Sequence, residues 1–321
     1  MGFSPVLLFV YNRIDHVKQT IEALSANSLS NDTDLIIYSD AAKKDEDIPK
    51  VDEVRRYIQE ELKGFRSIKY VLREQNYGLT RNIIEGVSNV VSEYGRVIVL
   101  EDDIVVGPHF LRYMNEALEK YENEKTVFEI SAYVEPIDSE GLDDSFFIRK
   151  TYCWGWATWA DRWKKYERNP YKTYKSFNLK EIHDFNMDGM GSEWDLVIYN
   201  LTGTVSSWAV FWSTTVYQNK GLVLVPQKSL IRNIGCDGSG TNYTIAVKNN
   251  EFDHISGDYE VKTYPDTIIE SEVGRKRVVE CLKKQRPDIL RRIWRNQILL
   301  FIEMMKWYFR GFLMHQNITE K

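Results

Sequence analysis

The sequence predicts an α/β fold built on a mostly parallel, doubly wound sheet. Over the first 135 residues, short apolar runs alternate with amphipathic segments whose apolar positions recur with helical spacing. This alternation is typical of parallel strands that are joined by helices. The run Val97–Leu100 is apolar at every position, which indicates a strand buried on both faces inside such a sheet.

The elements of this first part can be assigned in order along the chain. The expected strands are 5–11, 34–40, 67–72, 97–100 and 127–132. The expected helices cover about 16–26 after a cap at Asp15, about 49–63 before Gly64, a segment capped by Thr80, and a segment from Pro108 to about 122. Side-chain acceptors suit the start of a helix, glycine suits its end, and proline is tolerated in its first turn.

The pattern changes after residue 135. Residues 136–178 mix short strands with an aromatic segment at 152–159, and residues 179–205 are expected to be irregular. A helix over 206–219, a strand over 221–226 and a glycine-rich loop over 232–242 follow, and helices over 268–285 and 288–313 end the sequence. We therefore expect three parts: 1–135, 136–262 and a C-terminal helical extension, 263–321.

The composition excludes several classes of protein. The 321 residues carry a net charge of −5, with 43% hydrophobic and 28% charged residues, which is ordinary for a globular protein and gives no general attraction for nucleic acid. The three cysteines form no CxxC pair, which favours a reducing compartment over a disulfide framework or a zinc site. No apolar stretch approaches the ~20 residues that span a bilayer, and the first residues lack a signal-peptide pattern. We expect a cytoplasmic protein.

Three carboxylates directly follow the buried run: Glu101, Asp102 and Asp103. Carboxylates are costly at the end of a buried strand unless a cation lies beside them. Ligands bind at the carboxyl edge of open α/β sheets, and clustered carboxylates suit Mg²⁺ or Mn²⁺, which would hold a substrate phosphate. If 101–103 stays extended, Asp103 is the expected metal ligand, Asp102 a helper, and Glu101 a candidate to bind a sugar hydroxyl.

Two more charged residues are expected at the same edge of the sheet. Arg13 follows the first strand and Asp40 ends the second. Arginine provides planar recognition of a diphosphate or a base, and a carboxylate can accept hydrogen bonds from a uracil ring. Each residue alone is also explained as a solvated charge at a strand end. Because parallel strands bring their carboxyl ends together, these residues and the three acids form one constellation.

Two further segments have compositions that suit ligand contact. The segment 235–241 holds three glycines in seven residues, and glycine allows backbone N–H groups to approach a phosphate. We interpret this segment as a lid over a diphosphate, with a plain surface loop as the alternative. Trp154 and Trp156 flank Gly155 and can stack on a sugar ring, with a packed aromatic core as the alternative, above all for Trp159.

With these motifs, the chain resembles the nucleotide-sugar domain of GT-A fold glycosyltransferases. It is most similar to the inverting N-acetylglucosaminyltransferase I type, whose metal motif is Glu-Asp-Asp followed by a Pro-x-Phe helix. It also resembles bacterial sugar transferases that assemble surface polysaccharides. The segments that carry the resemblance are 11–13, 39–40, 99–110, 131–132, 153–156, Trp212, Gly221, 225–226 and 233–241.

The resemblance implies a GT-A (Rossmann-like) fold in which residues 1–135 bind the nucleotide sugar and residues 136–262 bind the acceptor. It implies a UDP-sugar donor, Mn²⁺ or Mg²⁺ as the cofactor, uracil contact by Asp40, phosphate contact near Arg13 and metal ligation by Asp103. The full set of expected donor-binding residues is Arg13, Asp40, Arg81, Glu101, Asp102, Trp154, Gly155, Trp156 and Ser239.

One departure from the family concerns the catalytic base. In the N-acetylglucosaminyltransferase I type, the base is an Asp just before the tryptophan that matches Trp212, whereas residues 208–211 of this chain hold no carboxylate. An inverting transferase needs a base for the acceptor hydroxyl. The candidates are Asp237, Glu193 and Asp195, and we prefer Asp237 because it lies in the glycine-rich segment.

We therefore expect a metal-dependent, inverting hexosyl- or N-acetylhexosaminyltransferase that moves a sugar from a UDP-sugar to a glycan, lipid-linked or protein-linked acceptor in bacterial glycan biosynthesis. A sugar nucleotidyltransferase is one alternative, but residues 12–16 lack the glycine-rich loop that such an enzyme shows after its first strand. A non-catalytic carbohydrate-binding protein with a degenerate site is another. The missing Asp supports it, and the intact acids 101–103 oppose it.

The last expected helix, 288–313, interleaves aromatic and aliphatic residues with arginine and lysine. Such a helix can lie on an anionic bilayer, form a dimer seam or pack on the rest of the chain. Expected partners are thus the UDP-sugar, the sugar acceptor and a membrane surface or a second copy, with no nucleic acid. Membrane contact would place the protein at the inner face of the cell membrane.

Overall fold

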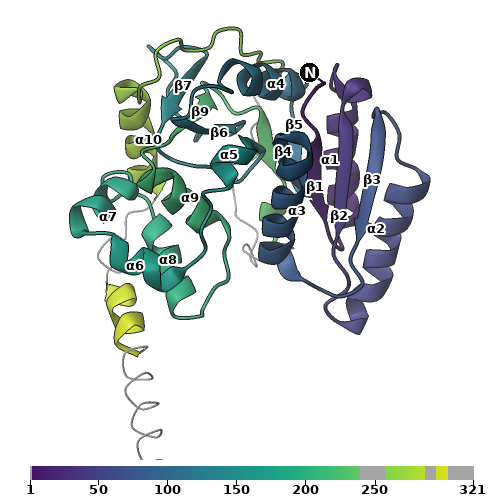
Figure 1. Cartoon of the computed structure of the whole chain (residues 1–321), viewed down its shortest axis with the longest axis horizontal. Coiled ribbons are helices and arrows are strands. Elements are labelled where there is room, and N and C mark those ends of the chain that lie inside the picture. Colours follow the sequence, from purple (N-terminus) through teal and green to yellow (C-terminus); the bar gives the residue numbers. More distant parts are fainter. Residues whose placement is uncertain (1, 239–256, 286–293, 303–321) are drawn as a thin grey trace, which may run out of the picture. The chain divides into compact units, whose positions relative to one another are not determined.

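The computed structural model describes residues 2–238, 257–285 and 294–302 (Figure 1). The chain forms two compact units. The first contains Met1–Tyr166 and Thr215–Val278, and the second contains Glu167–Thr214 and Val279–Lys321. Their boundaries differ from the expected ones at residues 135 and 262. The assignment of 1–135 and 136–262 as donor-binding and acceptor-binding halves of one domain stays a prediction.

The first unit is built on a single large sheet. Its strands are β1 (Val6–Val10), β2 (Asp34–Ser39), β3 (Ser67–Leu72), β4 (Arg96–Glu101), β6 (Val127–Ser131), β7 (Ser145–Ile148), β8 (Trp156–Trp159) and β9 (Leu222–Pro226). Among the described residues they form eight strands in the order β3-β2-β1-β4-β8-β6-β9-β7. The pairs β1–β2, β2–β3, β1–β4 and β6–β9 are parallel, whereas β8 and β7 run antiparallel to their neighbours. The predicted α/β fold with a mostly parallel sheet is confirmed.

Helices connect the parallel strands in the expected order. They are α1 (Ile14–Ser25), α2 (Ile48–Glu60), α3 (Gly78–Tyr94) and α4 (Phe110–Lys120), and the short α5 (Ala160–Trp163) follows β8. Strands β1, β2 and β6 are buried at every position. In α3, Gly86 allows close packing on β1, since a Cβ there would lie only 2.7 Å from the Phe9 ring. The layers are therefore held by apolar contacts on both faces of the sheet.

Two helices begin earlier than the sequence pattern predicts. Helix α1 starts at Ile14, so Asp15 lies in its first turn instead of capping it. Helix α3 starts at Gly78, so Thr80 lies inside it. The cap of α3 comes from Asp40 at the end of β2, which accepts hydrogen bonds from the backbone N–H groups of Tyr77 at 2.9 Å and Gly78 at 2.8 Å. A capping residue so distant in the chain leaves no local signal.

A two-stranded ribbon lies beside the main sheet in the first unit. Strand β5 (Ile104–Val106) pairs antiparallel with β10 (Ile231–Asn233), and Arg232 lies opposite Val105. β5 begins directly after Asp103, and β10 ends just before the glycine-rich segment. The ribbon therefore brings residues 101–103 and 234–238 to the same place.

The second unit is helical where the sequence pattern predicts irregular structure. The range 179–205 contains two helices, α7 (Leu179–Phe185) and α8 (Glu193–Leu201), which follow α6 (Pro170–Ser176). Asn178 and Glu181 make a capping box at the start of α7, and this pattern was visible in the sequence. Phe177, Phe185 and Trp194 pack against one another.

The remaining helices lie where the chain passes from one unit to the other, and in the last described segment. Helix α9 (Ala209–Gln218) and helix α10 (Glu272–Gln285) confirm the helices expected over 206–219 and 268–285. Residues 294–302 are also helical and belong to the segment that was expected to form the last helix. Within the part of the chain that the structure describes, each helix is too short or too polar to span a bilayer.

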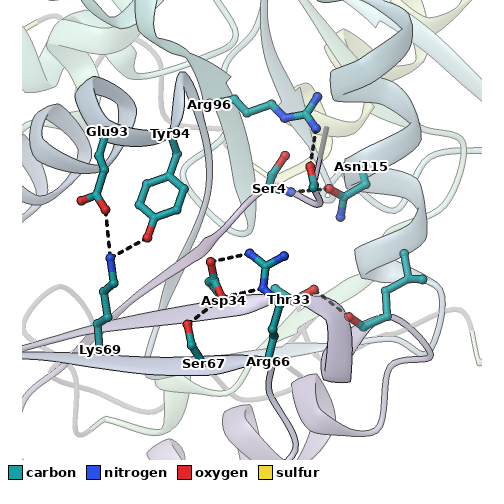
Figure 2. A network of polar contacts seen from close by, with 12 residues as sticks. Ser4, Thr33, Asp34, Arg66, Ser67, Lys69, Glu93, Tyr94, Arg96 and Asn115 are labelled. Atoms are coloured by element: carbon teal, nitrogen blue, oxygen red, sulfur yellow. Dashed lines mark hydrogen bonds and ion pairs between the residues drawn. The ribbon is translucent and has the colours of Figure 1, made fainter.

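Polar contacts stabilise the amino edge of the sheet, opposite the carboxyl edge (Figure 2). Arg66 donates two hydrogen bonds to Asp34, and Ser67 donates a third. The bond from Arg66 is the main reason why the pKa of Asp34 lies below its ordinary value. Lys69 donates to Glu93 and to Tyr94. The Arg66–Asp34 pair is thus an Arg–Asp contact remote from the acids that follow β4.

Candidate active site

The carboxyl ends of β1, β2 and β4 lie at one edge of the sheet because these strands are parallel neighbours. Residues 11–13 follow β1, Asp40 follows β2, and Glu101 ends β4. The constellation predicted from the sequence is therefore assembled in the first unit. Two of the residues after β1 also connect this edge to the segment after β2, since Tyr11 and Asn12 both donate to Asp47.

Arg13 forms ion pairs with two of the three acids. Its Nη2 atom donates to Asp102 and, at 2.8 Å, to Oδ2 of Asp103. The backbone N–H of Tyr11 donates to the second oxygen of Asp102 at 3.3 Å. Only 5% of Asp102 is exposed, so its carboxylate is a buried partner of Arg13. The sequence did not predict this ion pair, although it placed both partners at the same edge.

The sequence analysis assigned roles to the three acids on the condition that residues 101–103 stay extended. The structure does not meet this condition. β4 ends at Glu101, and residues 102 and 103 form a turn before β5. The hydroxyl of Thr20 in α1 donates to the carbonyl oxygen of Asp102 at 2.8 Å and holds this turn. The alternation of side chains assumed for 101–103 therefore does not apply.

Burial and mutual repulsion raise the pKa values of two of these acids. Burial, followed by the charges of Asp103 and Asp102, raises the pKa of Glu101 to about 8, and Arg13 opposes this shift. Burial also raises the pKa of Asp102, against the lowering effect of Arg13. One guanidinium thus does not fully compensate three carboxyl groups, and the site favours a further cation.

The glycine-rich segment lies against Asp103. The backbone N–H of Ile234 donates to the carbonyl oxygen of Asp103 at 2.9 Å. A Cβ on Gly235 would lie 2.1 Å from Oδ2 of Asp103, so only glycine allows this approach. In the same segment, Asp237 lies 3.2 Å from Nε2 of His16. The sequence analysis assigned His16 no role. Ser239 and the rest of the segment lie outside the described residues.

Asp40 is surrounded by hydrogen-bond donors. Besides Tyr77 and Gly78, the backbone N–H of Ala41 and the side-chain amide of Asn76 donate to it, each at 3.0 Å. A carboxylate has about four acceptor positions, so Asp40 organises the loop before α3. Contact between Asp40 and a uracil ring stays a prediction.

Arg81 lies in the first turns of α3. Its guanidinium carbon lies 3.7 Å from the centre of the Tyr77 ring, and that of Arg73 lies 4.4 Å from it. Arg81 also forms an ion pair with Glu85 at 2.6 Å. Tyr77 thus lies between two guanidinium groups next to the residues that donate to Asp40. The expected contact of Arg81 with the donor stays a prediction.

The aromatic segment before β8 divides between core and surface. Trp156 and Trp159 are 1% and 2% exposed, so both pack in the core, and the expected contact of Trp156 with a donor is not supported by its position. Trp154 is only partly buried and packs edge-on against Tyr133 with ring centres 4.8 Å apart. Gly155, with φ of 63°, gives the turn between them. Trp154 remains the candidate for sugar stacking.

The sequence analysis missed a buried polar cluster after β6. The hydroxyl of Tyr152 donates to Glu135, and Nζ of Lys150 lies 3.7 Å from the same carboxylate. Glu135 is 5% exposed. It follows a strand that runs in the same direction as β4. The rule that located Arg13 and Asp40 at strand ends would have located Glu135 as well.

Glu193 and Asp195 belong to the second unit. They lie in the first turn of α8. Asp195 is 5% exposed and accepts a hydrogen bond from Asn296 at 2.8 Å, which is typical of a structural carboxylate. Glu193 is partly buried, close to Gly191.

The donor set fits a metal that is shared with a substrate. Within the described residues, no three His, Cys, Asp or Glu side chains are grouped to hold an ion. Mg²⁺ and similar ions commonly take one or two carboxylates and complete their coordination with substrate phosphates and water. Asp103, beside the backbone of Gly235, suits that arrangement.

Comparisons with known proteins identify a family for this chain. The family model described as "Glycosyl transferase family 2" matches residues 6–191, which is more than half of the chain. No curated protein is significantly similar in sequence. Among solved structures, the chain is similar to S. aureus TarS with a TM-score of 0.41 and 10% identity, over 72% of this chain and 36% of that chain. The chain therefore spans well under two thirds of the length of TarS.

The raised pKa of Glu101 predicts how stability depends on pH. In the metal-free protein, the folded state keeps a proton on Glu101 between its ordinary value of 4.5 and about 8, whereas the unfolded chain releases it. The free energy of unfolding therefore decreases as pH rises through this window. Glu101→Gln cannot ionise and should lose less stability between about pH 5 and about pH 9.

Urea unfolding in the presence of a chelator measures this difference. Glu60→Gln is the matched control, since Glu60 is exposed. Parallel stability curves for the wild type and Glu101→Gln would contradict the assignment.

Proposed function

The chain belongs to glycosyl transferase family 2, and we propose that it transfers a hexosyl or N-acetylhexosaminyl group from a UDP-sugar to a sugar acceptor with inversion. The observation that carries the proposal is the edge where Arg13, Asp102, Asp103 and Gly235 meet. There, a guanidinium can bind a diphosphate next to carboxylates that can bind a metal. The acceptor is a glycan, lipid-linked or protein-linked sugar of bacterial glycan biosynthesis.

The roles of the residues follow from their positions. Asp103 would hold Mn²⁺ or Mg²⁺, which would neutralise the charge on the leaving diphosphate. Arg13 would bind the diphosphate, and Glu101 a hydroxyl of the donor sugar. Arg81 would contact the base, and Asp40 would contact it in exchange for one of its four present donors. Trp154 with Gly155 would lie under the sugar. Close positioning of the two reactants supplies a large part of the rate.

Asp103 should be more important for donor binding than Asp102. Asp102 is almost fully buried and receives hydrogen bonds from Arg13 and Tyr11, so Asp102→Ala should mainly lower thermal stability. Asp103→Ala should weaken Mn²⁺-dependent UDP binding by at least about tenfold, which is roughly 1.4 kcal/mol. Calorimetric titration of UDP with and without Mn²⁺ measures both variants. Tight, Mn²⁺-enhanced binding by Asp103→Ala would exclude Asp103 as the ligand.

Asp237 is the proposed catalytic base. It lies two residues after Gly235, is 46% exposed at its side chain and lies 3.2 Å from His16. A general base contributes about 10²-fold to 10⁴-fold, so Asp237→Asn should lower turnover by at least about 100-fold with little change in donor affinity.

Two comparison variants make this test specific. Glu193→Gln and Asp195→Asn remove the other candidate carboxylates, and they should keep turnover if Asp237 is the base. Normal turnover by Asp237→Asn together with an inactive Glu193→Gln or Asp195→Asn would show that Asp237 is not the base. The residue whose variant is inactive would then be the candidate base. If all three variants stay active, the anomer of the product, measured by NMR, decides between inversion and retention.

We propose a peripheral membrane contact through residues 294–302. Trp294, Ile298, Phe301 and Ile302 recur at helical spacing and are 71%, 52%, 58% and 43% exposed. The sequence around them is basic, with Arg291, Arg292, Arg295, Lys306 and Arg310, which complements an anionic lipid surface. The three cysteines are free thiols in the structure, which suits the cytoplasmic face.

Vesicle sedimentation tests this contact. Trp294→Ala with Phe301→Ala should reduce binding to anionic vesicles several-fold, because both side chains would enter the lipid interface. Leu179→Ala is the matched control, since Leu179 is 85% exposed elsewhere in the second unit. Unchanged vesicle binding would exclude the contact, and loss of a dimer in the double variant would assign this face to a second copy.

A further inference from the structure

Arg13 occupies the position of a cation among the acids. Its Nη2 atom donates to both Asp102 and Asp103. The side chains of Arg13, Asp102 and Asp103 are 19%, 6% and 16% exposed. The ion pair therefore lies largely out of water, where charge–charge interactions are stronger than at the surface. Asp103, the expected metal ligand, is thus already paired when no donor is bound.

We infer that Arg13 is an internal counter-ion that holds Asp103 until a diphosphate takes over its guanidinium, so that donor and metal bind cooperatively. This inference rests on the proposed function, because it assigns a new role to Arg13 within the same site. Arg13 is therefore a positioning residue for the metal as well as a ligand for the diphosphate.

The competition follows from the surroundings of one oxygen atom. Oδ2 of Asp103 accepts the hydrogen bond of Arg13 at 2.8 Å, and on another side the backbone of Gly235 approaches it so closely that a Cβ would lie at 2.1 Å. A divalent ion at this oxygen would lie within a few ångströms of the guanidinium, and like charges at that distance repel strongly. The ion can bind well only after Arg13 has moved away.

A diphosphate can replace the acids as the partner of Arg13. Arginine binds phosphate groups through paired hydrogen bonds as readily as it binds carboxylates. Within the described residues, Nη1 of Arg13 is buried and has no hydrogen-bond partner. The guanidinium thus keeps a donor for an arriving ligand while Nη2 holds the acids. Exchange of partners keeps the arginine paired and releases Asp103.

Binding of Mn²⁺ to the full chain tests this inference without any turnover. For the wild type, calorimetry should show weak Mn²⁺ binding alone. With saturating UDP, Mn²⁺ should bind at least about tenfold tighter, because the diphosphate then holds Arg13 away from Asp103. In Arg13→Met the counter-ion is absent. This variant should bind Mn²⁺ alone at least about tenfold tighter than the wild type, and UDP should then add little.

Two further variants control the result. Arg66→Met removes one positive charge from the Arg–Asp pair at the opposite edge of the sheet, so its Mn²⁺ affinity should equal that of the wild type. Arg13→Gln removes the charge but keeps side-chain N–H donors for the acids, and it should also bind Mn²⁺ alone more tightly than the wild type. Circular dichroism shows whether each variant is folded, and Arg13→Gln serves if Arg13→Met is not.

The outcomes separate this inference from the proposed function. If the folded Arg13 variants bind Mn²⁺ alone no more tightly than the wild type, or if UDP does not change the Mn²⁺ affinity of the wild type, the inference is overturned. UDP binding by the wild type with Mn²⁺ would then still support the proposed function. If the wild type binds no UDP under any condition, the proposed function fails, whereas the comparison of Mn²⁺ affinities still tests the counter-ion.

Discussion

Three carboxyl groups at the end of a buried strand would destabilise the fold if no cation lay beside them. Glu101, Asp102 and Asp103 end or follow β4, whose interior residues are buried. Arg13, which follows the neighbouring strand β1, pairs with Asp102 and Asp103. The pairing is possible because β1 and β4 are parallel and in register, with Phe9 opposite Glu101. The same contact that permits the burial of the acids also defines the candidate site.

The other parts of the site are built around this contact by long-range interactions. The β5–β10 ribbon brings Gly235 against Asp103 from more than a hundred residues away. Asp40 accepts four N–H bonds and so fixes the start of α3. Arg55 in α2 donates to the carbonyl oxygens at the ends of β2 and β3. A rigid edge of this kind suits the binding of a flexible diphosphate, because the protein loses little conformational entropy on binding.

Some local predictions failed where a distant residue replaced a local one. Thr80 was expected to cap α3, but Asp40 supplies the acceptors. The roles of residues 101–103 were assigned on the condition that they stay extended, but the ion pair with Arg13 and the hydroxyl of Thr20 stabilise a turn. The core positions of Trp156 and Trp159 could not be distinguished from surface stacking, since both uses favour aromatic residues. The helices within 179–205 were a different kind of error, because the capping box at Asn178 was available in the sequence.

The sequence by itself determined the α/β class, the order of the strands along the chain, and the residues that meet at the carboxyl edge. It could do so because apolar periodicity sets strands and helices locally, and parallel strands necessarily align their ends. Only the tertiary structure decided which atoms touch: that Arg13 binds two acids, that Asp40 caps a helix, and that His16 lies beside Asp237. Those contacts join residues far apart in the chain, and their geometry depends on the register and twist of the whole sheet, which no local pattern specifies.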